Sequence, residues 1–377
     1  MISLYEEFNR SWLTSCIGII LFCSGIWVLT SNEGRAVHHA HSLDEAHNSV
    51  FSLNPYTNLQ REYDGHLIHI SGPLIVEEPL TEPEYGISIQ SVKLRRRVQM
   101  YQWVEERKPR DDLARNNPDI ADYYYVTEWR DKLVDSSSFY IRHGHQNPSK
   151  KPLETHIYVA PFVRIGQIIL GNHIKEKFTN YVEVASDGTP DNKNIKFHLG
   201  IYYHCENIWE PEVGNIRIQF YYAGMSGDPI TIIAKLKDGV LVPYVTSKGQ
   251  EIALVGHGLL SVHEMFAFEY SEAKIQTWKM RAFGMFIIYA STVCLGRLLR
   301  IGFNQVPMLH NNFLQDPTAS SNFIISLSVS LFVISFAWIA YRPMLGAGLL
   351  LAAISPFFYC ILSLYNTIHV QNNYYNR

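Results

Sequence analysis

Histidines and acids gather most densely just after the first apolar stretch of the chain. His38, His39 and His41 are followed by Asp44 and His47. Imidazole and carboxylate groups are ligands for transition metals. On a helix, however, His38 and His41 would share a face while His39 would point away. We therefore predict a solvated helix here, with metal binding as the alternative.

Two further motifs resemble catalytic signatures without completing them. His263-Glu264 begins like a zinc-binding HExxH helix, but the second histidine is missing. The segment 224–227, GMSG, lacks the GxSxG spacing of a nucleophile elbow. Walker A, GxGxxG and CxxC patterns are also missing. We predict no catalytic residue, no metal site, no cofactor and no small-molecule substrate, so the protein is expected not to be an enzyme.

The most basic run lies in VKLRRRVQMYQWVEE, residues 92–106. Lys93, Arg95 and Arg97 are candidates for contacts with lipid headgroups or with a partner protein. The alternative is a solvated or salt-bridged strand. In a strand the charges alternate between faces, and Glu105 and Glu106 follow within a few residues.

A second candidate contact surface is APFVRIGQIILGNHIKEKF, residues 160–178. Pro161 suits a first helical turn, and a helix would bring Phe162, Ile165 and Ile169 to one face. Such a helix could lie flat in a membrane interface or pack on a sheet. Both interpretations stay open from the sequence.

Composition argues against nucleic acid as a partner and against a disulfide within the polar middle of the chain. The 377 residues are 47% hydrophobic and 18% charged, with a net charge of −3. A pI of about 6.6 gives no electrostatic case for nucleic-acid binding. Of the five cysteines, only Cys205 lies in the long polar middle, so that region holds no internal disulfide.

Apolar stretches at both ends predict a membrane protein. Residues 12–30 form 19 consecutive uncharged residues, enough to span a bilayer core as an uncleaved signal-anchor, with a cleaved signal peptide as the alternative. Three more apolar stretches lie in the last hundred residues. The one between Arg281 and Arg297 is short, so we expect its arginines to reach the headgroups. Ionisable residues are absent at mid-depth, which argues against a transporter.

The polar middle carries strand signals. HLIHISGPLIV at 66–76 and the basic run at 92–106 are predicted strands, separated from later elements by an expected surface loop at 108–119. Residues 214–258 are predicted to form an antiparallel meander. Its clearest hairpin is at Asp238-Gly239, and a weaker one is at Lys248-Gly249.

Together these signals predict a multi-pass α-helical membrane protein with a large α+β extramembrane domain rich in antiparallel sheet. We expect four transmembrane helices, one N-terminal and three C-terminal. The predicted segments are a cytosolic N-terminus at 1–11, helices at 12–30, 278–298, 321–341 and 344–365, the extramembrane domain at 31–277, a loop at 299–320 and a tail at 366–377. The distribution of Lys and Arg does not decide the orientation.

Several motifs occur in one co-linear order: NEGRAV at 32–37, VKLRRRVQMYQWVEE at 92–106, TEWR at 127–130, GHQNPS at 144–149, APFV at 160–163, YH at 203–204, PEVG at 211–214, YAGMSGD at 222–228, TW at 277–278 with Arg281, and YRP at 341–343. In these motifs the chain resembles the transmembrane protein 43 family, also called LUMA, over nearly its whole length. The segments at 108–122 and 181–199 and the tail look different.

The resemblance implies four spans, cytosolic termini and a lumenal domain. It also implies residence in the endoplasmic reticulum and inner nuclear membrane. Family members look like organisers of membrane protein complexes, with emerin-like and lamin proteins as partners and with self-oligomerisation. The expected function is therefore a non-enzymatic membrane scaffold that maintains nuclear envelope structure. The alternative is a lipid-binding or membrane-sensing module of the endoplasmic reticulum.

Overall fold

The computed structural model describes residues 12–54, 56, 62–107, 123–185, 190, 192, 194–305, 319–341 and 343–375. The expected N-terminus at 1–11, the surface loop at 108–119 and most of the loop at 299–320 lie outside the described residues. The chain divides into two compact units. We call residues 1–48, 246–250 and 263–377 the helical unit, and residues 49–245 and 251–262 the β unit.

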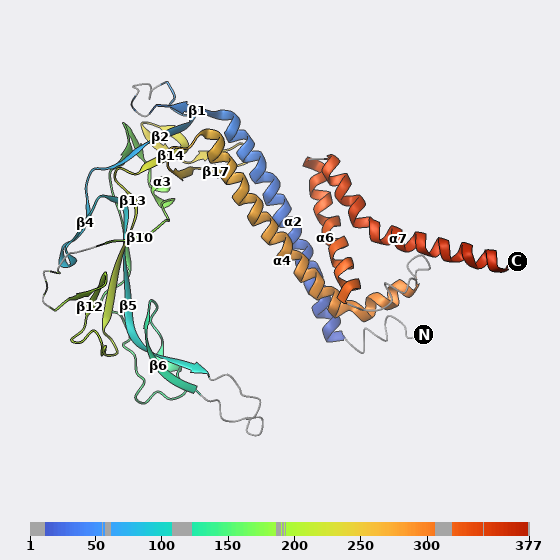
Figure 1. Cartoon of the computed structure of the whole chain (residues 1–377), viewed down its shortest axis with the longest axis horizontal. Helices are drawn as coiled ribbons and strands as arrows, with labels where there is room; N and C mark the ends of the chain where they lie inside the picture. Colours follow the sequence, from blue (N-terminus) through green and yellow to red (C-terminus); the bar gives the residue numbers. More distant parts are fainter. Residues whose placement is uncertain are drawn as a thin grey trace. The chain divides into compact units, whose positions relative to one another are not determined.

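Among the described residues, the helical unit contains four long helices: α2 (Trp12–Ser49), α4 (Val262–Gln305), α6 (Ala319–Tyr341) and α7 (Pro343–Tyr375) (Figure 1). Helices α2 and α4 pack as an antiparallel pair in which glycines allow close approach. A Cβ added to Gly25 would lie 2.6 Å from Ile288 Cγ1, and one added to Gly284 would lie 2.6 Å from Leu29 Cδ2. Small residues of this kind let apolar helices pack closely.

The expectation of four transmembrane helices is wrong. Two helices in the described part of the chain are long and apolar enough to cross a membrane, Trp12–Ser49 and Ser321–Ile339. The apolar part of α4 has 15 residues between Arg281 and Arg297. At 1.5 Å per residue it falls short of a hydrocarbon core of about 30 Å. In α7 the described apolar segment, Pro343–Tyr359, is also shorter than a span.

The first sheet of the β unit closes on itself. Its strands follow the order β1 (Val50–Leu53), β2 (Leu67–Val76), β8 (Val163–Ile165), β9 (Ile168–Leu170), β15 (Val240–Val242), β14 (Pro229–Lys237) and β18 (Leu254–His257), and β14 also pairs with β2. Alternation in β2 and β14 sends one set of β-branched side chains into the enclosed core, including Ile68, Ile70, Ile230 and Ile232.

The second sheet is open and is built around the longest strand. Its order is β11 (Lys196–His198), β12 (Ile201–His204), β13 (Ile216–Met225), β5 (Ser91–Arg107) and β6 (Tyr123–Arg130), with β10 (Val182–Glu183) on β13 and β7 (His156–Val159) on β5. A separate apolar core covers one face, centred on Tyr85, Tyr202 and Phe220. Burial raises the pKa of the Tyr85 hydroxyl to about 12, with Glu84 adding to the effect.

Short elements complete the β unit: β3 (Leu80–Glu82), η1 (Pro83–Tyr85), β4 (Ile87–Ile89), η3 (Ser136–Ser138), α3 (Asn172–Glu176), β16 (Tyr244–Val245) and β17 (Glu251–Ile252). The sheet-rich extramembrane domain expected from the sequence is therefore present, with little helix in it. The hairpin predicted at Asp238-Gly239 joins β14 to β15, and both residues have positive φ, 52° and 80°.

The meander predicted for residues 214–258 is only partly correct. Strands β13 and β14 follow one another in sequence, but β13 pairs with β5 whereas β14 pairs with β2. The chain changes sheet between them at Gly224 and Gly227, both with positive φ. The strand signals were local, while the choice of partner strand depended on segments more than a hundred residues away.

Candidate functional site

Strand β5 divides the basic run between two faces of the open sheet. Val92, Leu94 and Val98 are fully buried. Arg96 lies on their side of the strand and pairs with Glu82 at 2.7 Å. Lys93, Arg95 and Arg97 lie on the opposite side, as the two-residue period of a strand requires. The three basic candidate residues named from the sequence therefore project from one side of β5.

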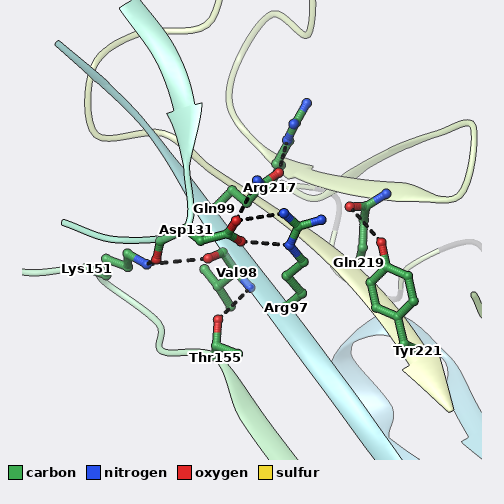
Figure 2. Close-up of polar contacts among 9 residues, drawn as sticks. All are labelled: Arg97, Val98, Gln99, Asp131, Lys151, Thr155, Arg217, Gln219 and Tyr221. Carbon is green, nitrogen blue, oxygen red and sulfur yellow. Dashed lines mark hydrogen bonds and ion pairs between the residues drawn. The ribbon is translucent and has the colours of Figure 1, made fainter. Parts of the chain in front are cut away.

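The centre of that face is a polar cluster around Asp131 (Figure 2). Arg97 donates two hydrogen bonds to its carboxylate, from Nε to Oδ1 and from Nη2 to Oδ2, each 2.7 Å long. The amide of Gln99 donates to Oδ2 at 3.3 Å and its Oε1 accepts from Arg217 Nε at 2.8 Å. Lys151 donates to the backbone carbonyl of Asp131. The hydrogen bonds from Arg97 hold the pKa of Asp131 below its ordinary value.

Aromatic rings hold two other arginines of this face. The guanidinium of Arg217 lies 4.9 Å from the centre of the Trp129 ring, and that of Arg95 lies 5.7 Å from the centre of the Tyr181 ring. The Nε of Arg95 is buried and has no hydrogen-bond partner among the described residues. Stacking fixes the arginines while leaving part of each guanidinium for another group.

Lys93 does not join them at the surface. Its side chain is buried, and Nζ donates to the carbonyl of Glu176 at 2.8 Å. Lys175 behaves alike and donates to the carbonyls of Ala160 and Pro161. Burial lowers the pKa of both lysines. Both ammonium groups therefore act as structural donors.

The predicted amphipathic helix at 160–178 is wrong. The segment forms the β8–β9 hairpin, turning at Gly166 with φ of 57°, followed by the five-residue helix α3. Alternation with period two prevails: Ile165 is fully buried, whereas Ile169 is 41% and Phe162 is 53% exposed. The three residues therefore do not form one apolar face.

Side chains of the motifs that suggested a metal site or a nucleophile form contacts with other residues of the protein. His39 lies 3.8 Å from a carboxylate oxygen of Glu269, and Asp44 accepts a hydrogen bond from Tyr270. Ser226 in the glycine turn accepts from the amide of Val76 at 3.3 Å. In the described ranges, no three His, Cys, Asp or Glu side chains come together in a way that could hold a metal ion.

A buried ion pair links three helices of the helical unit. Glu33 is fully buried, and Arg281 donates to it from Nε and Nη2 at 2.7 and 2.8 Å. Trp338 of α6 donates from its indole to the same carboxylate at 2.8 Å. The Arg281 guanidinium also lies 4.9 Å from the centre of the Trp278 ring. Arg281 is therefore neutralised within the protein, whereas the sequence suggested contact with headgroups.

Comparison with known proteins decides the family. The family model described as transmembrane protein 43 matches residues 100–343. The Drosophila melanogaster transmembrane protein 43 homolog is 45% identical over 95% of this chain and 96% of its own length. The chain belongs to the transmembrane protein 43 family.

Vertebrate relatives agree with that assignment. Transmembrane protein 43 from Homo sapiens is 32% identical over 90% of this chain and 88% of its own length, and the Pongo abelii protein is 32% identical over 93% and 90%. No solved structure matches the chain. The resemblance found in the sequence motifs is confirmed, and the protein is a member of a transmembrane protein family.

The sequence analysis did not identify several residues of the Asp131 cluster and of the buried Glu33 ion pair. Asp131, Arg217 and Trp129 lie far from the basic run in sequence and join it only through strand pairing. Glu33 and Trp338 are 305 residues apart. No local pattern points to these residues, because strand pairing and helix packing over long sequence separations bring them together.

Proposed function

We propose that this protein is a non-enzymatic membrane scaffold that organises protein complexes at the endoplasmic reticulum and inner nuclear membrane and so maintains nuclear envelope structure. One observation carries the non-enzymatic part of the proposal. The polar side chains that offered chemistry in the sequence, among them Lys93, Arg97 and Ser226, contact other parts of the protein. Groups that are already paired within the protein stabilise a fold rather than act on a substrate.

The proposal includes a side of the membrane and a class of partner. We place the β unit in the lumen and expect emerin-like proteins, lamins and further copies of the chain as partners. The family resemblance supports these assignments. The near-neutral charge of the chain supports protein and membrane partners over nucleic acid.

Proximity labelling with the full chain at the nuclear envelope tests the scaffold role. We expect emerin-type inner nuclear membrane proteins to be enriched over bulk reticulum proteins. Recovery of bulk reticulum proteins alone would contradict the nuclear-envelope assignment.

Glycosylation mapping tests the side of the membrane. Asn194→Thr creates an Asn-x-Thr acceptor at Asn192, which is exposed. An endoglycosidase-sensitive mass shift is expected if the β unit is lumenal. The wild-type chain, with an Asn-x-Ser acceptor at Asn9, is the control. A shift in the wild type, with none added by Asn194→Thr, would place the β unit on the other side.

A further inference from the structure

The open sheet has an outer face with a surplus of positive charge. Its pairings place Glu183, Tyr221, Arg95 and Ile157 in one row across four strands, and Lys196, Tyr203, Arg217 and Gln99 in another. On this side of the sheet the cations outside the core are Arg95, Arg97, Arg107, Lys196 and Arg217, and we call this side the arginine face. The acids on the same side are Glu105, Asp131 and Glu183, and Glu105 already accepts hydrogen bonds from Tyr125 and from the amide of Tyr140.

The arginines of this face differ in whether a carboxylate already neutralises them. Arg97 is engaged by both oxygens of Asp131. In the residues that the structure describes, Arg95 and Arg217 have ring and amide contacts, and no carboxylate pairs with either. A guanidinium that is held against a ring and still has N–H groups without an acceptor is well suited to bind a phosphate oxygen.

At the tip of the β11–β12 hairpin, next to this face, the backbone has a conformation that is unfavourable for the residue found there. Leu199 has φ of 49° and Gly200 has φ of 77°. Asn, Asp or Gly normally occupy both positions of such a turn, because a side chain such as leucine is strained there. Leu199 is nevertheless 82% exposed, so burial in the fold does not explain the strain.

A second exposed apolar side chain lies beside the tip. Trp209 is 78% exposed, and its ring centre lies 5.4 Å from that of His198, the residue before Leu199. The loop that carries Trp209 also holds Glu206 and Glu210. The tip therefore offers apolar contact, and the positive charge comes from the arginine face. Tryptophan at such a place is typical of the water–lipid interface.

We propose that the arginine face docks on the surface of a phospholipid bilayer. Leu199 and Trp209 enter the boundary between headgroups and acyl chains, and Arg95 and Arg217 bind lipid phosphates. Charge complementarity and the strained, exposed leucine carry this inference, and neither is needed for the scaffold role. These contacts take the place of the lipid contacts expected from the sequence at Lys93, Phe162, Ile165 and Ile169. The ammonium group of Lys93 is buried and donates to the carbonyl of Glu176, and the other three residues do not share a face.

Co-flotation with vesicles tests the proposal. The full chain is held in a non-ionic amphipol, so that it has no bilayer of its own. It is mixed with vesicles of phosphatidylcholine alone or of equal parts phosphatidylcholine and phosphatidylserine. We expect binding to both, stronger and salt-sensitive with phosphatidylserine. Arg95→Gln and Arg217→Gln should each weaken binding to the anionic vesicles about fivefold.

Leu199→Asn separates docking from folding. Asparagine tolerates the left-handed backbone, so the variant should melt about 2–4 °C higher while binding vesicles roughly tenfold more weakly. Trp209→Ala should also weaken binding. The controls are Phe51→Ser, which removes an exposed ring from β1 of the other sheet, and Arg164→Gln, whose arginine pairs with Glu77 on that other sheet. Neither control should change binding.

Three results would overturn the proposal. The first is a Leu199→Asn variant that is stabilised but binds vesicles as the wild type does. The second is unchanged binding to anionic vesicles in both arginine variants. The third is absence of vesicle binding by the wild-type chain, which would assign the arginine face to a protein partner instead.

Discussion

At the residue scale, Asp131 links the arginine face to pH. Its folded-state pKa is lowered by hydrogen bonds from Arg97, below the ordinary value of about 3.9. A lowered carboxylate pKa contributes stability that is present above about pH 3.9 and is lost as the pH falls through the folded value. Because the side chain is 46% exposed, screening limits the contribution to below about 1 kcal/mol.

We expect Asp131→Asn to reduce the free energy of unfolding of the β unit at neutral pH and to flatten its acid dependence below about pH 4. Urea titrations followed by tryptophan fluorescence at several pH values measure both effects. Glu206→Gln, at an exposed position, serves as the control. An acid dependence identical to that of the wild type would contradict the assigned role of the Arg97–Asp131 pair.

Glu33 is the residue whose loss should cost the helical unit most. Removing one partner of a buried ion pair leaves the other charge uncompensated, at about 3–5 kcal/mol. We expect Glu33→Ala to lower the melting temperature sharply, and Glu33→Ala with Arg281→Met to recover part of the loss. Arg35→Ala, two residues along on the exposed side of α2, is the control. A double variant no better than Glu33→Ala would argue against charge burial as the cause.

At the scale of elements, α2 and α4 are held in register by close packing at glycine. Gly25→Ala should destabilise the pair by about 1–3 kcal/mol through overpacking, because the new Cβ meets Ile288 Cγ1 at 2.6 Å. Gly34→Ala in the same helix has nothing within 4 Å. It should be stabilising by about 0.5–1 kcal/mol. Thermal denaturation followed by circular dichroism compares them, and equal effects would refute the packing argument.

At the scale of the whole molecule, two compact units predict two unfolding transitions. Hydrogen exchange measured on peptides from each unit should give unfolding midpoints that do not coincide in urea. Asp131→Asn should shift only the transition of the β unit, and Glu33→Ala only that of the helical unit. A single shared transition shifted by both substitutions would show that the two units unfold together.

The sequence by itself determined what depends on neighbours along the chain. A run rich in β-branched residues predicted β2, and alternation of apolar and basic residues predicted β5. Asp238-Gly239 predicted the β14–β15 hairpin, because two residues of positive φ suffice to define that turn. The apolar run at 12–30 predicted a membrane helix, and the co-linear motifs predicted the family. The same local reasoning failed at 160–178, where Gly166 turns a helix-like pattern into a hairpin.

Only the tertiary structure decided which segments meet. Beside β5 lie Arg217 from β13 and Asp131, the residue after β6. The carboxylate of Glu33 is contacted by Arg281 and Trp338 from two other helices. Backbone pairing and helix packing over long sequence separations make these choices, and no local pattern encodes them. The strained Leu199 is likewise visible only once the turn is formed, since strain is a property of the backbone angle and not of the residue type.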